Sequence, residues 1–208
     1  MTRTLIHRHA AVMGTVLLAG ILLSACTTTD GAPGLGSTAT SAAATIGNAD
    51  VVFAQHMIPH HQQAVAMAAL AGTRASDPEI KTLATQIETA QDPEITMMTG
   101  WLRAWGKPLP DASTGDMDMD MGDGAGMGNG SVPGMMSAAD MTKLAAVSGK
   151  EFDKQFLLMM IEHHQGAITM AQDEVNAGNS PDAVALANKI VTAQQAEIVT
   201  MKKILARL

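Results

Sequence analysis

Two pairs of adjacent histidines, each following a methionine three positions earlier, are the residues of this chain best suited to chemistry. The repeated motif is Met-x-x-His-His, and its six residues are Met57, His60, His61, Met160, His163 and His164. Imidazole nitrogen and thioether sulfur bind soft and borderline transition metals, and a thioether in place of a carboxylate shifts the preference from iron towards copper, above all Cu(I). The motif therefore predicts a copper site, and Ag(I) should bind similarly.

The motif lies within a longer stretch that the chain contains twice. Residues 53–68 and 156–171 share Phe, Met, Ile, both histidines, Gln, Ala and a final Met-Ala at one constant offset. The same offset relates residues 78–98 to residues 181–201, where Pro, Leu-Ala, Ile, Ala-Gln, Glu-Ile and Met recur. A register kept over this length indicates an internal duplication. Each half is expected to form one helical hairpin.

Helical periodicity turns the histidine pairs towards the interior. On a helix, Met57 lies at the centre of an apolar stripe, and His60 and His61 straddle that stripe at about −60° and +40°. The second half repeats this arrangement. The alternative to a metal site is a purely structural hydrogen-bond network among the four histidines.

The second helix of each hairpin carries polar residues on its own apolar stripe. These are Gln91 and Glu94 in the first half and Gln194 and Glu197 in the second. A carboxylate in such a position requires a hydrogen-bonding or charged partner, and the histidines of the neighbouring helix are the expected partners. Contacts between carboxylates and histidines orient metal-binding imidazoles, so these four residues are predicted to support the site from outside the ligand set.

Further side chains could contribute ligands. They are a histidine beside the first motif, two methionines that follow the motifs, and three methionines that alternate with aspartates: His56, Met67, Met170, Met117, Met119 and Met121. A methionine on a helix stripe more often fills the core than binds metal. The alternating run could wrap Cu(I) in a linear or trigonal geometry, or it could be a solvated acidic linker.

Four long helices are expected to position these side chains, with a short helix between the hairpins. Their expected bounds are from Asn48 or Asp50 to Gly72, from Pro78 to about Trp105, and about 137–147, 150–176 and 182–208. Pro59 and Pro93 lie inside helical patterns, so bends are expected in the first hairpin only. The sequence shows no alternating pattern typical of strands. The apolar stripes of the four helices predict an all-α four-helix bundle around one core.

Residues 1–25 have the features of a bacterial export signal, namely a charged start, a short apolar run and small residues before Cys26. The tetrapeptide Leu-Ser-Ala-Cys resembles a lipobox, which implies lipidation of Cys26 and anchoring on the extracytoplasmic side of a membrane, in the periplasm or at the cell surface. An ordinary signal peptide with an incidental cysteine is the alternative. Residues 26–48 predict a flexible tether and residues 49–208 the helical domain, with a mobile linker at 111–136.

The charge of the chain argues against nucleic acid as a partner. The formal net charge is −7, and removal of the signal, which contains two basic residues and no acidic one, changes it to −9. Such a surface repels phosphate backbones and attracts cations. A single cysteine excludes a disulfide within the chain, whereas the 17 methionines offer soft ligands that do not enter disulfide chemistry.

Three stretches resemble the bacterial DUF305 family, whose better-understood members are CopM-like copper-binding proteins of the cell envelope. They are Asp-x-x-Phe-x-x-x-Met-x-x-His-His-x-x-Ala-x-x-Met-Ala at 50–68, Gln-x-x-Glu-Ile-x-x-Met-x-x-Trp-Leu at 91–102, and Pro-Gly-Met-Met at 133–136. The resemblance implies a ferritin-like bundle, a part in copper homeostasis or resistance, and the six motif residues as ligands. The second half departs from the pattern, because Ile204 and Leu208 stand where the first half has tryptophans.

The leading interpretation is a membrane-anchored lipoprotein that sequesters or relays copper and catalyses nothing, with a copper-transfer protein as a candidate partner. An oxidase of Cu(I) would use the same core site. A bundle that binds b-type haem is a second alternative, because His/Met axial ligation occurs within four-helix bundles. A structural or partner-binding envelope domain without metal is a third.

Overall fold

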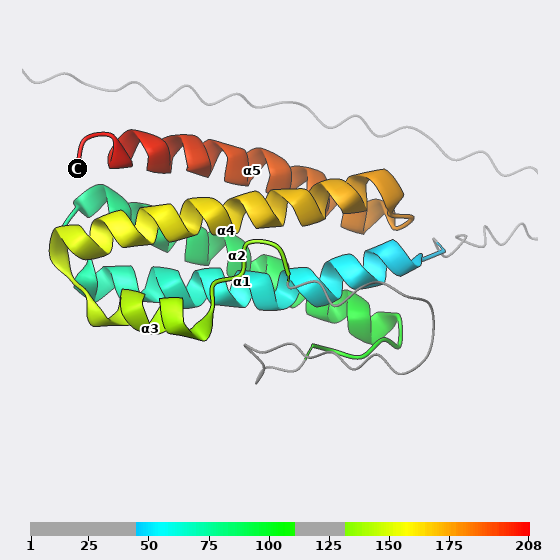
Figure 1. Ribbon diagram of the computed structural model, residues 1–208. Coiled ribbons are helices and arrows are strands. Elements are labelled where there is room, and N and C mark those ends of the chain that lie inside the picture. Colours follow the sequence, from blue (N-terminus) through cyan, green and yellow to red (C-terminus); the bar gives the residue numbers. More distant parts are fainter. Residues whose placement is uncertain (1–44, 111–131) are drawn as a thin grey trace, which may run out of the picture. The chain divides into compact units, whose positions relative to one another are not determined.

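The computed structural model describes residues 45–110 and 132–208 of the chain. In these two ranges the chain forms five helices and no strand: α1 (Asn48–Arg74), α2 (Pro78–Ala104), α3 (Ala138–Ala146), α4 (Gly149–Ala177) and α5 (Pro181–Leu205). The first hairpin consists of α1 and α2 and the second of α4 and α5, and α1 packs along α4 in the opposite direction (Figure 1). The predicted all-α bundle of two hairpins is confirmed.

Helices α2 and α5 begin at the capping residues that the sequence shows. The side chain of Asp77 accepts a hydrogen bond from the N–H of Glu79 at 2.8 Å, and a proline occupies the first turn of both helices. Ser180 caps α5 in the same way, accepting from the N–H of Ala183 at 3.3 Å. The duplicated Pro thus marks the start of the second helix in each half. This start was predicted for the first half, whereas the helix of the second half was expected to begin one residue later, at 182.

The helix ends differ from the predicted ones by a few residues. Helix α1 continues past Gly72 to Arg74, because one glycine inside a helix costs only about 1 kcal/mol and does not by itself end it. Helix α5 ends at Leu205 instead of the predicted Leu208. Helices α1 and α2 also run through their internal prolines without a break. The bends expected at these prolines stay a prediction.

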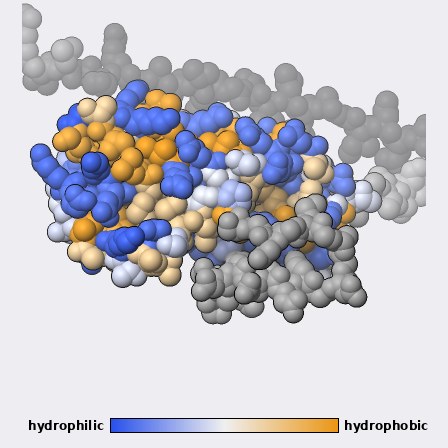
Figure 2. All heavy atoms as spheres, in the orientation of Figure 1, coloured by the Kyte–Doolittle hydropathy of each residue, from blue (hydrophilic) through white to orange (hydrophobic). Residues whose placement is uncertain are grey.

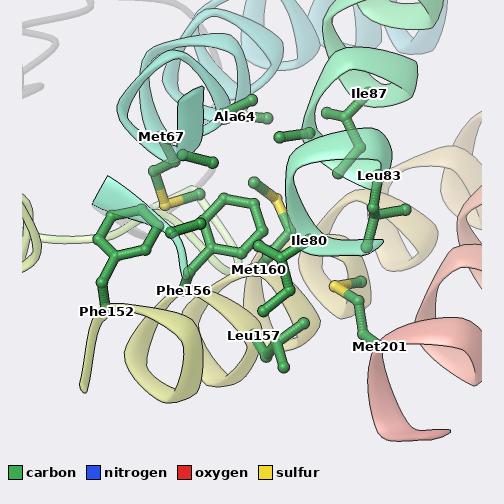
Figure 3. Close-up of a cluster of buried hydrophobic side chains, with 14 of the residues drawn as sticks. Ala64, Met67, Ile80, Leu83, Ile87, Phe152, Phe156, Leu157, Met160 and Met201 are labelled. Atoms are coloured by element: carbon green, nitrogen blue, oxygen red, sulfur yellow. The ribbon is translucent and has the colours of Figure 1, made fainter. Parts of the chain in front are cut away.

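Two clusters of buried apolar side chains fill the bundle. The first joins the end of α1 to the start of α4 (Figure 3) and includes Met67, Phe152, Phe156, Met160 and Met201. The second joins the start of α1 to the end of α4 and includes Phe53, Met57, Met98, Met170 and Ile190. Equivalent residues of the two halves, such as the motif phenylalanines, therefore lie in different clusters, and the middle of α1 and α4 lies between them.

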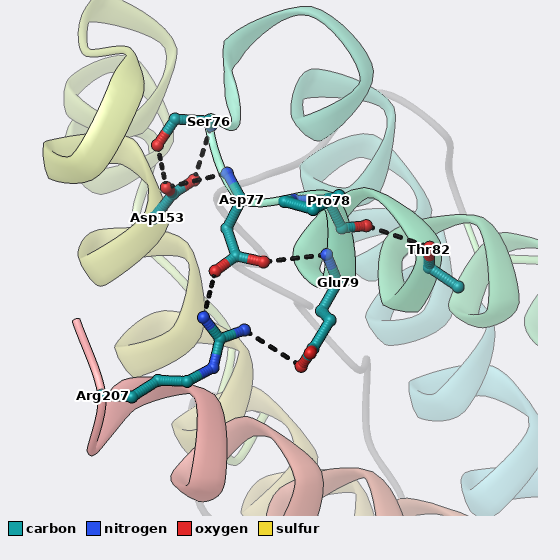
Figure 4. A network of polar contacts seen from close by, with 7 residues as sticks. All are labelled: Ser76, Asp77, Pro78, Glu79, Thr82, Asp153 and Arg207. Atoms are coloured by element: carbon teal, nitrogen blue, oxygen red, sulfur yellow. Dashed lines mark hydrogen bonds and ion pairs between the residues drawn. The ribbon is translucent and has the colours of Figure 1, made fainter.

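Each hairpin is tied to the loop of the other by a buried aspartate. Asp153, near the start of α4, accepts the N–H groups of Ser76 and Asp77 at 3.0 and 3.1 Å and also the hydroxyl of Ser76 (Figure 4). Asp50 occupies the equivalent position on α1, and it accepts two N–H groups of the loop 178–180 at 3.0 and 2.8 Å. Each hairpin therefore supplies the carboxylate that binds the loop N–H groups of the other hairpin, and we call these contacts the exchanged caps.

Residues 132–136, which we call the strap, pack against the bundle although the linker was predicted to reach residue 136. The side-chain amide of Gln63 pairs with the N–H and the carbonyl of Met136 at 2.7 and 2.9 Å. Gly134 has a φ of 76°, and a Cβ there would meet backbone atoms of α4 at 2.9 Å. Only glycine permits both this φ and this approach, so the strap lies directly on α4.

The surface mixes polar and apolar side chains. Figure 2 shows apolar residues over α4 and α5 at the end of the bundle where the chain ends. Among the large apolar side chains, Leu158 of α4 and Val199 of α5 are about half exposed. Scattered exposure of this kind is ordinary for folded domains. In the two described ranges, none of the helices combines the length and the apolar character that crossing a membrane requires.

Candidate metal centre

The two histidine pairs meet where the middle of α1 faces the middle of α4. All four side chains, His60, His61, His163 and His164, are fully buried. The rings of His60 and His163 are in contact across the two helices, with centroids 3.6 Å apart and planes inclined by 35°. Both members of each pair therefore face the interior, as expected for residues that straddle one stripe.

Each hairpin holds one histidine with a carboxylate from its own second helix. Nε2 of His61 lies 2.9 Å from Oε2 of Glu94, and Nε2 of His164 lies 2.6 Å from Oε2 of Glu197. These are the two contacts that the helical stripes predicted. Lys189 forms an ion pair with the other oxygen of Glu94 at 3.1 Å. Burial raises the pKa of Glu94, but the hydrogen bond and charge of His61, followed by Lys189, outweigh it and lower that pKa overall.

The hydrogen bonds place a proton on Nε2 in three of the four rings. A carboxylate or carbonyl oxygen only accepts, so Nε2 carries the proton in His61, in His164 and in His60, which donates to the carbonyl of Pro133 at 3.1 Å. In the uncharged form of each ring the lone pair is then on Nδ1, and all three Nδ1 atoms are buried without a partner among the described residues. Neither ring nitrogen of His163 is paired within those residues. The cluster thus holds lone pairs that a cation could engage.

Burial keeps two of the rings uncharged. Desolvation, together with the charges of His61 and His164, lowers the pKa of His60 to about 3. Desolvation and the neighbouring histidines likewise lower the pKa of His163 well below its ordinary value. Metals bind the unprotonated imidazole, so at neutral pH these two rings need not lose a proton first.

The two motif thioethers lie on opposite sides of the histidines. Met57 and Met160 are both fully buried, Met57 in the second apolar cluster and Met160 in the first. Throughout residues 45–110 and 132–208, no three His, Cys, Asp or Glu side chains are grouped so as to hold a metal ion. A cation at the histidines would therefore take further ligands from the thioethers, or require small movements of the rings.

The other predicted candidates are placed less centrally. Met67 is fully buried in the first cluster, whereas His56 is half-buried and lines a pocket together with Met170. The amides of Gln91 and Gln194 are buried, and their oxygens have no partner in the part of the chain that the structure describes. Four candidates lie outside the described residues: Cys26, Met117, Met119 and Met121.

Two residues that contact the site were not predicted. Pro133 contributes its carbonyl to His60, and Lys189 contributes its charge to Glu94. The sequence around Pro133 reads as linker because it is rich in glycine, and a lysine on the flank of a helix resembles any solvated lysine. The match of Pro-Gly-Met-Met at 133–136 to the family pattern is the one sequence signal in the strap, but these residues were predicted to belong to the mobile linker.

The fold and the site define a class: all-α bundles of two duplicated hairpins with a buried histidine cluster at their centre. The chain belongs to one family of this class, described as "Domain of unknown function (DUF305)", which matches residues 50–205. No curated protein matches the chain in sequence.

Solved structures of the same family share the fold. A DUF305 protein from Streptomyces coelicolor is 35% identical, with a TM-score of 0.65 over 76% of this chain and 93% of that one. A DUF305 fragment from Deinococcus radiodurans is 31% identical, with a TM-score of 0.66 over 78% of this chain and 99% of that one. CopM in its Cu(I)-bound form is 31% identical, with a TM-score of 0.59 over 76% and 96%, and CopM has also been solved in Cu(II)-bound and Ag-bound forms.

Proposed function

We propose that this protein sequesters or relays copper outside the cytoplasm, holding the ion at the histidine cluster and catalysing no reaction. The observation that carries the proposal is the cluster itself: four fully buried histidines whose unpaired nitrogens, among the described residues, face no hydrogen-bond donor or acceptor. Buried polar atoms are normally paired, so an orphaned set of ligand atoms favours a missing cation over simple packing. The existence of copper-bound and silver-bound forms of the similar protein CopM supports the proposal that this chain binds the same metals.

The charges around the cluster favour a monovalent ion. The proposed ligands, imidazole and thioether, are neutral. Of the two carboxylates that hold histidines, Glu94 is already paired with Lys189, whereas Glu197 makes no ion pair with a lysine or arginine of the described residues. One remaining negative charge balances one positive charge in a buried site, which favours Cu(I) or Ag(I) over Cu(II).

The location belongs to the same proposal. The export features of residues 1–25 and the lipobox-like sequence before Cys26 support a lipoprotein on the outer side of a membrane. The relative from Streptomyces coelicolor is described as a secreted protein. A copper-transfer protein that delivers or removes the ion would complete the relay.

A Cu(I) titration of the full chain against a competing chelator tests the proposal. The variant has all four histidines changed to Ala, and a second variant has Met117, Met119 and Met121 changed to Leu. We expect the histidine variant to lose tight binding and the methionine variant to keep it. Circular dichroism checks that the histidine variant is folded, and His163→Gln alone is the conservative substitute if it is not. Equal binding by wild type and a folded histidine variant would refute a metal site at the cluster.

A further inference from the structure

A pocket of about 580 Å³ lies between the start of α1 and the end of α4, one helical turn beyond His60. The residues that line it include Phe53, His56, Pro133, Met170, Asp173 and Glu174. The pocket therefore combines apolar walls with an imidazole, a thioether and two carboxyl groups.

The duplication gives this pocket an equivalent place at the other end of the bundle, between the start of α4 and the end of α1. There α3 packs against the two helices, with Leu144 fully buried in the first apolar cluster. Arg74 donates to the carbonyl of Val147 at 3.3 Å, which fastens the end of α3. No helix in the described residues covers the pocket in the corresponding way.

The two places differ at three equivalent positions. Beneath α3 these are Leu70, Ala71 and Met159, whereas in the pocket they are Asp173, Glu174 and His56. An apolar helix seated on the pocket would bury polar groups without partners, at a cost of about 2 kcal/mol or more for each. The pocket is thus suited to a polar or charged occupant.

The buried carboxyl group of Glu174 indicates that the occupant of the pocket is positively charged. It is 1% exposed, and its carboxyl group lies against the carboxyl group of Asp50, while no N–H donor and no lysine or arginine of the described residues reaches it. Its neighbour Asp50 already accepts the N–H groups of the loop 178–180. Burial, followed by the hydrogen bond and charge of Asp50, raises the pKa of Glu174 to about 8. Such a carboxyl is stabilised by any cation that takes the place of its proton.

We propose that this pocket is a second metal site, separate from the histidine cluster, in which His56 and Met170 bind a soft monovalent cation such as Cu(I) or Ag(I) and Glu174 supplies the negative charge. The soft cation follows from the imidazole and thioether on the wall. The proposal rests on the copper function and adds a second binding position to it. Asp173, exposed at the rim, adds to the attraction for cations.

Ag(I) titration of the full chain, with ¹³C-labelled methionine methyl groups observed by NMR, tests this site. Ag(I) is diamagnetic, so each methyl reports its own ligation, and single Met→Leu variants assign the signals. In wild type we expect the methyl of Met170 to shift in addition to those of Met57 and Met160. In His56→Ala the shift of Met170 is lost while the other two remain, and Glu174→Gln weakens it. Met159→Ala, at the equivalent position beneath α3, is the matched control and leaves all three shifts unchanged.

The outcomes separate the two proposals. If Met57 and Met160 respond but Met170 does not, the second site is refuted and the copper function stands. If Met170 still shifts in His56→Ala, its response is an indirect effect of the core site, and the second site is again refuted. If no methyl responds, the copper function itself fails. Because His56 is only half-buried, we expect His56→Ala to fold, and the unshifted methyl signals report this directly.

Discussion

The nitrogen of His164 that can bind a metal is determined by Glu197. The carboxylate holds Nε2–H at 2.6 Å, which leaves the lone pair on Nδ1. In Glu197→Gln the amide cannot supply the same charge, so the ring is less basic and less well oriented. We expect the Cu(I) affinity to fall by about 10-fold to 100-fold, measured by chelator competition. Asp92→Asn, on the exposed side of α2, is the control and should bind as wild type does. No loss in Glu197→Gln would contradict the supporting role.

A second effect at the residue scale is the dependence of stability on pH through Glu174. The folded chain raises the pKa of this carboxyl from 4.5 to about 8, so between these values the folded state holds a proton that the unfolded state has lost. The contribution of Glu174 to the free energy of unfolding is therefore complete below pH 4.5 and lost as the pH rises to 8. We expect Glu174→Gln, which stays neutral, to flatten this decline in thermal unfolding measured from pH 5 to 9. An identical decline in both proteins would show that other groups cause it.

Helical phase predicted the site residues that lie on regular helices. The contacts of Glu94 and Glu197 with histidines follow from two stripes that face each other within a hairpin, and both are present. The pairing of Glu174 with Asp50 was not predicted, because the two residues come from different hairpins and their approach depends on how α1 and α4 pack. Local sequence contains no signal for such a contact.

At the scale of elements, the strap depends on a close approach to α4 at Gly166. A Cβ at this residue would lie 2.1 Å from the carbonyl oxygen of Pro133, the same oxygen that accepts from His60. Gly166→Ala should therefore displace the strap and lower the free energy of unfolding, which chemical denaturation measures. Gly100→Ala is the matched control, because that helical glycine has open space around it, and we expect it to stabilise by up to about 1 kcal/mol. Equal effects would mean that the approach at Gly166 is unimportant.

The helices themselves were predictable and the strap was not. Apolar stripes, N-cap residues and the duplicated prolines are local signals, and they placed α1, α2, α4 and α5 to within a few residues. The strap has the composition of a linker, and its order comes from Gln63 and His60, both more than 70 residues away along the chain. The glycine-rich composition shows that the strap cannot form a core by itself. Its fixed position comes from contacts with residues far away in the sequence, which composition does not reveal.

At the scale of the whole molecule, the hairpins depend on each other through Asp50 and Asp153. Asp153→Asn removes the charge that receives two N–H groups and a hydroxyl of the loop between α1 and α2 (Figure 4). We expect the free energy of unfolding to fall by about 2 kcal/mol, measured by denaturant titration. The control is Arg207→Ala, which breaks ion pairs with Asp77 and Glu79 at 2.6 and 3.0 Å. The side chain of Arg207 is about half exposed, and ion pairs at the surface contribute little. If Arg207→Ala lowered the free energy of unfolding more than Asp153→Asn does, the proposed importance of Asp153 would be contradicted.

The duplication predicted two equivalent hairpins, but it gave no sign that their caps are exchanged. Asp50 and Asp153 precede their motifs by the same distance, and each reads locally as an acid near a helix start. That each side chain reaches the other hairpin follows from the opposite directions of α1 and α4, which bring the start of one helix beside the loop that follows the other. The repeat in the sequence does not specify how α1 and α4 are oriented relative to each other.

The exchanged caps have a consequence for amide hydrogen exchange. Amides of short surface loops ordinarily exchange through small local openings, without unfolding of the core. Here the N–H groups of Ser76, Asp77, Asn179 and Ser180 are bound to carboxylates of the opposite hairpin. Their release requires the two hairpins to separate, so these loop amides should be as protected as those in the middle of the helices, and their exchange rates would report how often the hairpins part.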